Sequence, residues 1–157
     1  MIKKILFVCT GNSCRSVMAA ELLRNMLKGK ATDFEISSAG TSALDGMGAS
    51  SEAHRAMLRE GIDLSSHRSK RVTSQMISEA DLILVMEKAH RDIIINITPE
   101  AENKVYLLKS FMEERPENFN LEIPDPIGKP AEIYEEDLIV MCDSLLGMIK
   151  KFNLNKK

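Results

Sequence analysis

The feature that most constrains the fold of this chain is residues 5–16, with the sequence ILFVCTGNSCRS. It opens with a short apolar run, 5–8, which is typical of a buried parallel strand. Residues 17–27 then combine helical propensity with a helical spacing of apolar side chains. Because a strand, a tight polar loop and a helix follow one another, loop N–H groups and a helix N-terminus point at one place. Such a place attracts anions, so the stretch predicts an anion-binding loop.

The side chains of this loop indicate a reaction at the anion. Cys9 ends the strand and faces a helix N-terminus and a guanidinium, an environment that favours the nucleophilic thiolate at neutral pH. Arg15 offers a planar pair of donors that suits two oxygens of a phosphate. Ser16 can hydrogen-bond the thiolate and help it leave in a second step. The alternative is a buried cysteine beside an unrelated surface arginine, and the flanking strand and helix argue against it.

The loop backbone also has residues suited to a tight turn around a ligand. Gly11 is expected to let the backbone turn sharply and approach the anion. Asn12 tolerates the left-handed conformation better than most residues. The predicted phosphate-binding residues are those that follow the nucleophile, namely Thr10, Gly11, Asn12, Ser13, Cys14, Arg15 and Ser16.

Residues 9–16, CTGNSCRS, resemble the phosphate loop of the low-molecular-weight protein tyrosine phosphatase family, especially its bacterial members. The resemblance extends over nearly the whole chain. It implies a phosphocysteine mechanism with Cys9 as nucleophile and Arg15 as phosphate clamp, and phosphorylated proteins as partners. The family usually has Pro directly after the Ser, at a helix position that tolerates it. This chain has Val17 there, a departure that touches no reacting group.

Size and composition fit one ordinary domain. The chain has 157 residues, 44% of them hydrophobic, and a net charge of −2, so we expect a single domain over 1–157 and no nucleic-acid partner. No apolar run approaches the roughly 18–20 residues of a membrane span, and we do not expect the first residues to act as a signal peptide, which would need a longer apolar segment and a small-residue cleavage site. Three cysteines without metal-ligand spacing indicate a reducing cytoplasm and neither metal nor cofactor. A monomer is the default expectation.

Hydrophobic patterning predicts alternating strands and helices. The expected strands are 5–8, 34–37, 81–86 and 104–107, with a short extended piece at 62–64, a turn at 38–41 and helices at 17–27, 52–60, 73–79, 88–97 and 132–152. This alternation predicts an α/β domain with a parallel sheet, which binds ligands beyond the strand C-termini, where Cys9 lies. The resemblance implies a four-stranded parallel sheet with helices on both faces and the phosphate loop between the first strand and first helix.

Attack of a thiolate on phosphorus expels an anionic leaving group, and that step needs a proton donor. Asp125 lies between Pro124 and Pro126, which stiffen the loop and hold it extended. By itself this pattern indicates an exposed turn aspartate. The family carries an Asp-Pro on a late loop as its general acid, and the resemblance assigns that role to Asp125.

The resemblance also assigns supporting roles. A Ser before Ala and a His after the next extended segment hold the loop Asn in the family, and these match Ser38 and His67. The family pairs its two loop cysteines in a reversible disulfide that protects the nucleophile, which gives Cys14 a redox role beside Cys9. Cys14 as a small loop-lining thiol is the alternative.

The remaining histidines and the third cysteine carry no predicted chemistry. We expect His54 and His90 at the surface without partners, and Cys142 in the core.

The substrate preference depends on residues around the mouth of the loop. Ser13 is small and polar where tyrosine-specific members of the family often carry a bulky apolar residue, and its arginine-phosphatase branch carries Thr. Leu44 and Ile127 occupy positions where tyrosine phosphatases usually have aromatic rings. Both phosphotyrosine and phosphoarginine therefore remain candidate substrates.

A loop of this kind is also compatible with two functions other than phosphate-ester hydrolysis. Arsenate reduction on the same kind of loop needs two more cysteines near the middle of the chain, and none lies between Cys14 and Cys142. A non-catalytic phosphopeptide-binding module would not require the nucleophile Cys9 or the acid Asp125.

Overall fold

The computed structural model of the chain describes residues 1–29 and 33–156. Four parallel strands form one sheet in the order β2-β1-β3-β4. These strands are β1 Lys4–Cys9, β2 Glu35–Gly40, β3 Leu82–Val85 and β4 Val105–Leu107. Because β2 pairs with one side of β1 and β3 with the other, the strand order reverses at β1, and α/β sheets bind ligands at such a switch point. The predicted four-stranded parallel α/β fold is confirmed.

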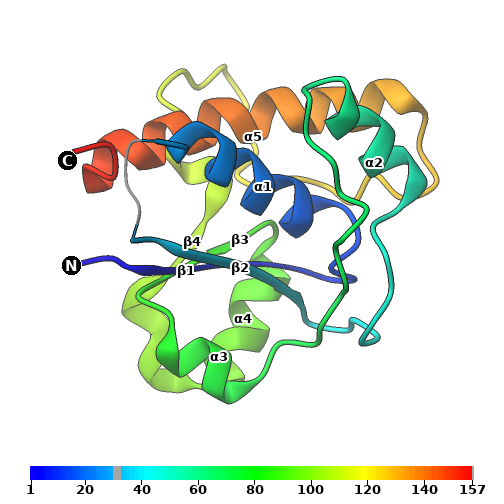
Figure 1. The fold of residues 1–157 in the computed structure, drawn as a ribbon. Helices are drawn as coiled ribbons and strands as arrows, with labels where there is room; N and C mark the ends of the chain where they lie inside the picture. Colours follow the sequence, from blue (N-terminus) through cyan, green and yellow to red (C-terminus); the bar gives the residue numbers. More distant parts are fainter. Residues whose placement is uncertain (30–32, 157) are drawn as a thin grey trace.

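Helices cover both faces of the sheet (Figure 1). One face carries α1 Arg15–Leu27, α2 Ser51–Leu58 and α5 Ala131–Phe152, together with the short 3₁₀ helix η2 Leu108–Phe111. The other face carries α3 Ser74–Glu79, α4 Lys88–Ile97 and the 3₁₀ helix η1 Pro99–Lys104. The loop between β1 and α1 therefore opens at the edge of the sheet where all four strands end.

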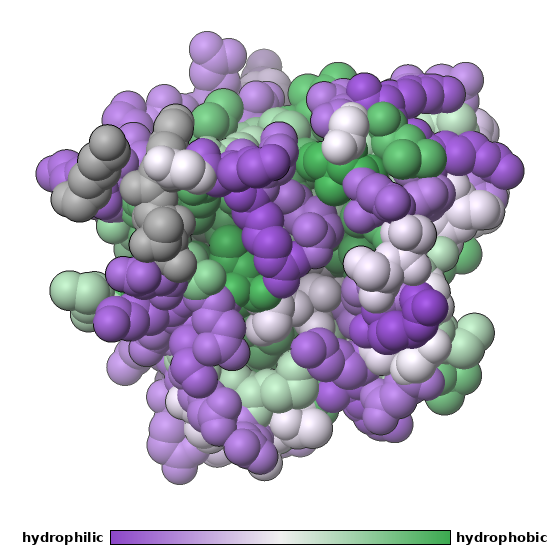
Figure 2. Space-filling model, in the orientation of Figure 1, coloured by the Kyte–Doolittle hydropathy of each residue, from purple (hydrophilic) through white to green (hydrophobic). Residues whose placement is uncertain are grey.

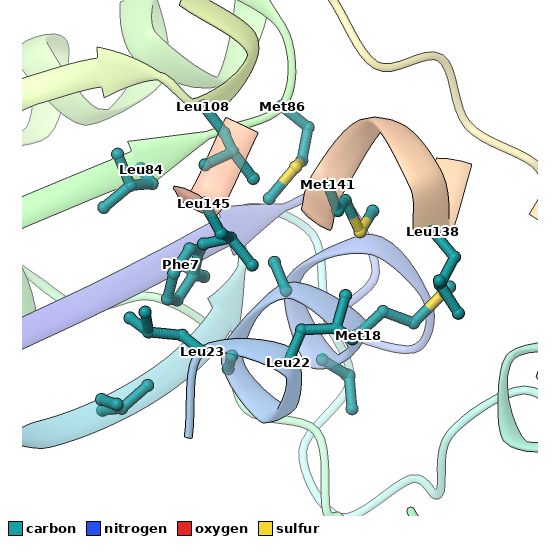
Figure 3. Packing of buried hydrophobic residues seen from close by; sticks show 14 of the residues in the cluster. Phe7, Met18, Leu22, Leu23, Leu84, Met86, Leu108, Leu138, Met141 and Leu145 are labelled. Carbon is teal, nitrogen blue, oxygen red and sulfur yellow. The ribbon is translucent and has the colours of Figure 1, made fainter. Parts of the chain in front are cut away.

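The alternation of side chains along β1 decides which face receives the cysteine. Leu6 and Val8 pack against the face of α3 and α4, whereas Phe7 and Cys9 belong to the core under α1 and α5. Figure 3 shows Phe7 among apolar side chains of this core, where burial of each large side chain contributes about 1.5–3 kcal/mol. The thiol of Cys9 thus emerges on the same face as the N-terminus of α1.

Charged and polar side chains dominate the outer surface on the side drawn in Figure 2. Among the described residues, none of the helices is long and apolar enough to cross a membrane.

One sequence prediction of secondary structure was wrong near the site. Residues 38–40, expected in a turn, continue β2 because they pair in parallel register with residues 7–9 of β1. Residues 62–64, expected to be extended, belong to no strand, and the N–H of Ile62 closes the end of α2 by bonding Met57 O at 3.0 Å. The helix predicted over 88–97 has those bounds in α4.

Gly40, the last residue of β2, lies directly against the loop that follows β1. A Cβ atom there would be 2.5 Å from Thr10 O and 2.9 Å from Asn12 N, both backbone atoms that cannot rotate away. Only glycine therefore allows β2 to run to the sheet edge while the loop passes beside it. Local composition predicts a turn at Gly40 and does not reveal this packing role.

We expect Gly40→Ala to lower the free energy of unfolding by about 1–3 kcal/mol and to distort the loop. Urea denaturation and turnover of p-nitrophenyl phosphate would measure the two effects. Gly48→Ala is a matched control, because a Cβ there has nothing within 4 Å. Equal stability of the two variants would contradict this role of Gly40.

Candidate active site

The backbone of the loop after β1 is turned so that its N–H groups face inward. Its carbonyl oxygens bond groups outside the loop or in α1: Thr41 N to Cys9 O, Ser42 N to Thr10 O, His67 Nε2 to Asn12 O, Ser50 N to Ser13 O and Met18 N to Cys14 O, at 2.7–2.9 Å. The C=O and N–H of a planar peptide unit point to opposite sides. With the carbonyls directed outward, the N–H groups converge on the loop centre and form an anion-binding nest.

The thiol of Cys9 has a hydroxyl donor beside it. Ser16 Oγ lies 3.0 Å from Cys9 Sγ and accepts a hydrogen bond of 2.8 Å from Asn12 Nδ2. Because the hydroxyl oxygen accepts from Asn12, its own hydrogen is free to point at the sulfur. Both atoms are buried. Ser16 is thus placed to stabilise negative charge on Cys9.

Asn12 fixes the shape of the loop. It has the left-handed φ of 53° that the sequence analysis expected it to tolerate. Its amide donates to Ser38 Oγ at 2.9 Å, and its side-chain oxygen accepts from Lys70 N at 3.0 Å. The expected contacts of Ser38 and His67 with Asn12 are therefore present, with His67 on the backbone carbonyl.

Gly11 has an ordinary backbone conformation. Its φ is not positive, and a Cβ there would meet Ser13 Oγ at an ordinary 3.5 Å. Asn12, not Gly11, makes the left-handed turn.

Arg15 is buried, with 2% of its surface exposed, and is oriented by two oxygens from other segments. Its Nη1 donates to Glu87 Oε2 at 2.7 Å and to Ile123 O at 2.8 Å. The other edge of the guanidinium, Nε and Nη2, has the geometry to donate to two oxygens of one anion. Nη2 makes longer contacts, 3.5 Å to Thr10 Oγ1 and 3.6 Å to Asp125 Oδ2.

Asp125 is brought to this guanidinium from a loop 110 residues further along the chain. Its side chain is 42% exposed, so solvent and a leaving group can reach it. The carboxylate also accepts a hydrogen bond of 3.1 Å from the N–H of Ile127. A buried thiol, a buried guanidinium and an exposed carboxyl group therefore meet at one loop.

The family model for low molecular weight phosphotyrosine protein phosphatase matches residues 4–157. The chain belongs to this family. A protein-arginine-phosphatase from Geobacillus stearothermophilus is 38% identical over 145 residues, which are 90% of this chain and 93% of that protein.

Solved structures agree with this assignment. The crystal structure of the tyrosine phosphatase AmsI from Erwinia amylovora has a TM-score of 0.86 and 31% identity, covering 96% of this chain and 93% of the other. A Cys-to-Ser mutant of the arginine phosphatase YwlE, with a phosphorylated active-site serine, has a TM-score of 0.86 and 29% identity and covers 96% of this chain and 95% of the other.

The second loop cysteine of this low-molecular-weight phosphatase is a free, buried thiol. Cys14 Sγ lies 3.1 Å from Ser50 Oγ and 4.0 Å from Tyr134 OH. Burial raises the pKa of Cys14 and raises that of Tyr134 to about 12, so both groups are protonated at neutral pH. Cys142, expected in the core, is half-buried and packs against it.

The predicted specificity residues lie at the surface around the site. Ser13 is partly exposed, and Leu44 and Ile127 are 74% and 58% exposed. Met47, which the sequence analysis did not single out, is 58% exposed on the same loop as Leu44. The exposed side chains of Leu44, Met47 and Ile127, here called the aliphatic rim, offer apolar contact without an aromatic sandwich.

Glu87 and His90 are site residues that the sequence analysis missed. The expectation of a surface His90 without a partner was wrong, since it is 2% exposed and lies 2.8 Å from Thr10 Oγ1. His54 also has a partner, because its Nδ1 accepts from Leu64 N at 3.3 Å. Glu87 follows β3 by two residues, and the C-terminal end of a parallel strand is the position that should have drawn attention to it.

Asp137 on α5 is an ionisable group buried without a full set of partners. It is 7% exposed, and its Oδ2 has no hydrogen-bond partner among the described residues. Burial raises its pKa to about 7, repulsion from Glu136 and Asp125 adds to the shift, and attraction to Arg15 opposes it. The native protein therefore holds a proton on Asp137 under mildly acidic conditions in which the unfolded chain has released it.

This difference makes stability depend on pH. Between pH about 4 and 7 the native state binds the extra proton, so the free energy of unfolding falls as pH rises. Asp137→Asn cannot titrate, and its stability relative to wild type should rise by about 2–3 kcal/mol from pH 5 to pH 8. Urea denaturation at both pH values would measure this.

Asp143→Asn is the control, because Asp143 is exposed on the same helix. Its stability relative to wild type should change little with pH. If the difference in free energy of unfolding between Asp137→Asn and wild type is the same at pH 5 and pH 8, Asp137 is ionised in the native protein at both pH values, which contradicts the prediction.

Proposed function

We propose that this chain hydrolyses phosphotyrosine or phosphoarginine on proteins through a phosphocysteine intermediate. The observation that carries the proposal is the convergence of Cys9, the buried Arg15 and Asp125 on one loop whose N–H groups face inward. Binding alone would need the N–H groups and the guanidinium. The nucleophile and the exposed carboxyl group are useful only if a bond to phosphorus is broken.

In the first step the phosphoryl oxygens bind the loop N–H groups and the Nε–Nη2 edge of Arg15. The Cys9 thiolate attacks phosphorus, a sulfur–phosphorus bond forms, and the bond from phosphorus to the leaving oxygen or nitrogen breaks. Protonated Asp125 gives its proton to the leaving atom. Negative charge that builds on the phosphoryl oxygens meets donors that are already oriented, which is the main source of rate acceleration in such a site.

In the second step water attacks the phosphocysteine, and the Asp125 carboxylate accepts its proton. The sulfur–phosphorus bond breaks and inorganic phosphate leaves. The Ser16 hydroxyl, 3.0 Å from the sulfur, stabilises the departing thiolate. The phosphorylated active-site serine in the YwlE mutant supports a covalent intermediate in this family.

The choice between the two substrates rests on Ser13 and the aliphatic rim. Each of the two activities is represented among the proteins similar to this chain. A protein-arginine-phosphatase is 38% identical, and a tyrosine phosphatase of known structure is 31% identical. A hydroxyl at Ser13 suits a polar guanidinium, whereas the exposed Leu44 and Ile127 can contact either side chain. Side-by-side rates on phosphotyrosine and phosphoarginine peptides decide between them.

The redox role of Cys14 and the cytoplasmic location are part of the same proposal. Cys14 shares the loop with Cys9, and a disulfide between them would shield the nucleophile from irreversible oxidation. Three free thiols support a reducing compartment. Arsenate reduction is not favoured, because it needs two more cysteines near the middle of the chain, and the one cysteine outside the loop, Cys142, lies in α5.

We expect Cys9→Ser to bind inorganic phosphate and lose turnover of p-nitrophenyl phosphate by a factor on the order of 10³ or more, because an alkoxide is much harder to form than a thiolate. Steady-state kinetics and calorimetric phosphate binding measure the two properties. Turnover within about tenfold of wild type would reject the mechanism.

Asp125→Ala tests the proton donor of the first step in the same assay. A general acid matters most for a poor leaving group, so the variant should slow phenyl phosphate by about 10²–10⁴ and p-nitrophenyl phosphate much less. The same loss on both esters would assign Asp125 to binding instead.

If Ser13 selects the substrate, Ser13→Ile should depress phosphoarginine hydrolysis and spare or raise phosphotyrosine hydrolysis. A bulky apolar side chain favours a phenyl ring and displaces a polar guanidinium. The ratio of kcat/KM on two peptides of otherwise equal sequence measures the effect. Ser13→Thr, which keeps the hydroxyl, is the control, and equal losses on both substrates in Ser13→Ile would limit Ser13 to supporting the loop.

A further inference from the structure

His90 joins the start of α4 to the phosphate loop, and none of the catalytic steps above uses it. Its Nε2 lies 2.8 Å from Thr10 Oγ1, and its Nδ1 accepts a hydrogen bond of 3.1 Å from the backbone N–H of Glu87. Only 2% of the residue is exposed. Thr10 directly follows the nucleophile, so this contact couples α4 to the residue next to Cys9.

The two contacts determine which ring nitrogen carries the proton. A backbone N–H can only donate, so Nδ1 is the acceptor and carries no hydrogen. In the neutral ring the proton is then on Nε2, which donates to Thr10 Oγ1. The carboxylate of Glu87, with Oε2 3.5 Å from His90 Nε2, favours the same tautomer.

The hydroxyl of Thr10 is left with one hydrogen to donate. Its oxygen accepts from His90 Nε2 and, at 3.5 Å, from Arg15 Nη2. A hydroxyl has two acceptor positions and one hydrogen, so with both acceptor positions directed at these donors the hydrogen points in a third direction. Arg15 Nη2 is also one of the proposed phosphate donors. A phosphoryl oxygen bound there therefore lies next to the Thr10 hydroxyl.

We propose that His90 is a positioning residue that makes the Thr10 hydroxyl a hydrogen-bond donor to the bound phosphoryl group. The inference deepens the proposed function and rests on it. Glu87 connects the two donors, because its Oε2 accepts from Arg15 Nη1 at 2.7 Å while its backbone N–H holds the His90 ring. The N-terminus of α4 thus orients both the clamp and the hydroxyl.

The surroundings of the ring favour its neutral form. Burial lowers the pKa of His90 and the charge of Arg15 lowers it further, although Glu87, Asp125 and Glu122 act in the opposite direction. An imidazolium would place an N–H at Nδ1 against the N–H of Glu87 and lose that hydrogen bond. The neutral ring therefore keeps both hydrogen bonds that hold it between Glu87 and Thr10.

Amide substitutions separate the two ring nitrogens. His90→Asn places an amide near Nδ1 and loses the donor to Thr10, whereas His90→Gln extends an amide N–H toward the position of Nε2. We expect His90→Asn to weaken binding of inorganic phosphate about tenfold, the loss of one hydrogen bond, and to raise the KM for p-nitrophenyl phosphate by a similar factor. His90→Gln should stay within about threefold of wild type.

The Thr10 side chain supplies the coupling test. In a Thr10→Val background, His90→Asn should change phosphate binding by less than about twofold, because the hydroxyl that His90 orients is absent there. Thr10→Ser keeps the hydroxyl and should bind phosphate more tightly than Thr10→Val by the factor that one hydrogen bond supplies. Nitrogen NMR of the imidazole should place the hydrogen of His90 on Nε2. A hydrogen on Nδ1, equal losses in the Asn and Gln variants, or additive losses in the double variant would overturn the proposal.

The phosphate-binding measurements can be made in a Cys9→Ser background, so they do not require turnover. If the wild type does not turn over substrate, the proposed catalysis fails but phosphate binding can still be measured. If the wild type turns over normally and His90→Asn binds phosphate as tightly as the protein with His90, only the inference about His90 is overturned. Urea denaturation checks that each variant folds. If His90→Asn does not fold, the comparison of Thr10→Val with Thr10→Ser and the NMR tautomer of wild type decide the question.

Discussion

The structure depends above all on a buried guanidinium. A charge removed from water is costly unless it is paired and hydrogen-bonded, and Arg15 is 2% exposed. Its Nη1 donates hydrogen bonds to the Glu87 carboxylate, two residues after β3, and to the backbone oxygen of Ile123 in the loop that carries Asp125. Both partners bond Nη1, whereas Nη2 makes the longer contacts to Thr10 and, at 3.6 Å, to the half-exposed Asp125. The arrangement that makes burial of the charge tolerable thus leaves the Nε–Nη2 edge for the phosphate of the proposed reaction.

The sheet brings these partners together. Parallel strands all end at one edge, and β1 lies between β2 and β3, so residues after each of these strands become neighbours of the loop. Gly40 at the end of β2 lets the loop backbone pass closely, and Glu87 after β3 reaches its arginine. The α1 helix starts at Arg15 itself. The position of the site at the strand-order reversal thus follows from topology, and its chemistry follows from a few side chains at the strand ends.

Much of the fold was predictable from local patterns. The apolar run before Cys9 and the helical spacing after Ser16 predicted β1 and α1, and the alternation of the remaining segments predicted the parallel sheet. The errors arose where tertiary pairing overrode local preference. Residues 38–40 look like a turn by composition but extend β2, because β1 offers them a complete row of hydrogen-bonding partners.

The sequence by itself determined the loop chemistry, because Cys9, Asn12, Arg15 and Ser16 lie within eight residues and the contacts of Ser16 with Cys9 and Asn12 are local. Only the tertiary structure decided which distant groups complete it. Glu87, His90 and Ile123 O are 70 to more than 100 residues away along the chain, and no local spacing indicates that a histidine on a helix will be buried against a loop threonine. Local hydrogen bonds follow from short spacing, whereas the meeting of strand ends follows from sheet order and register, which the whole core decides.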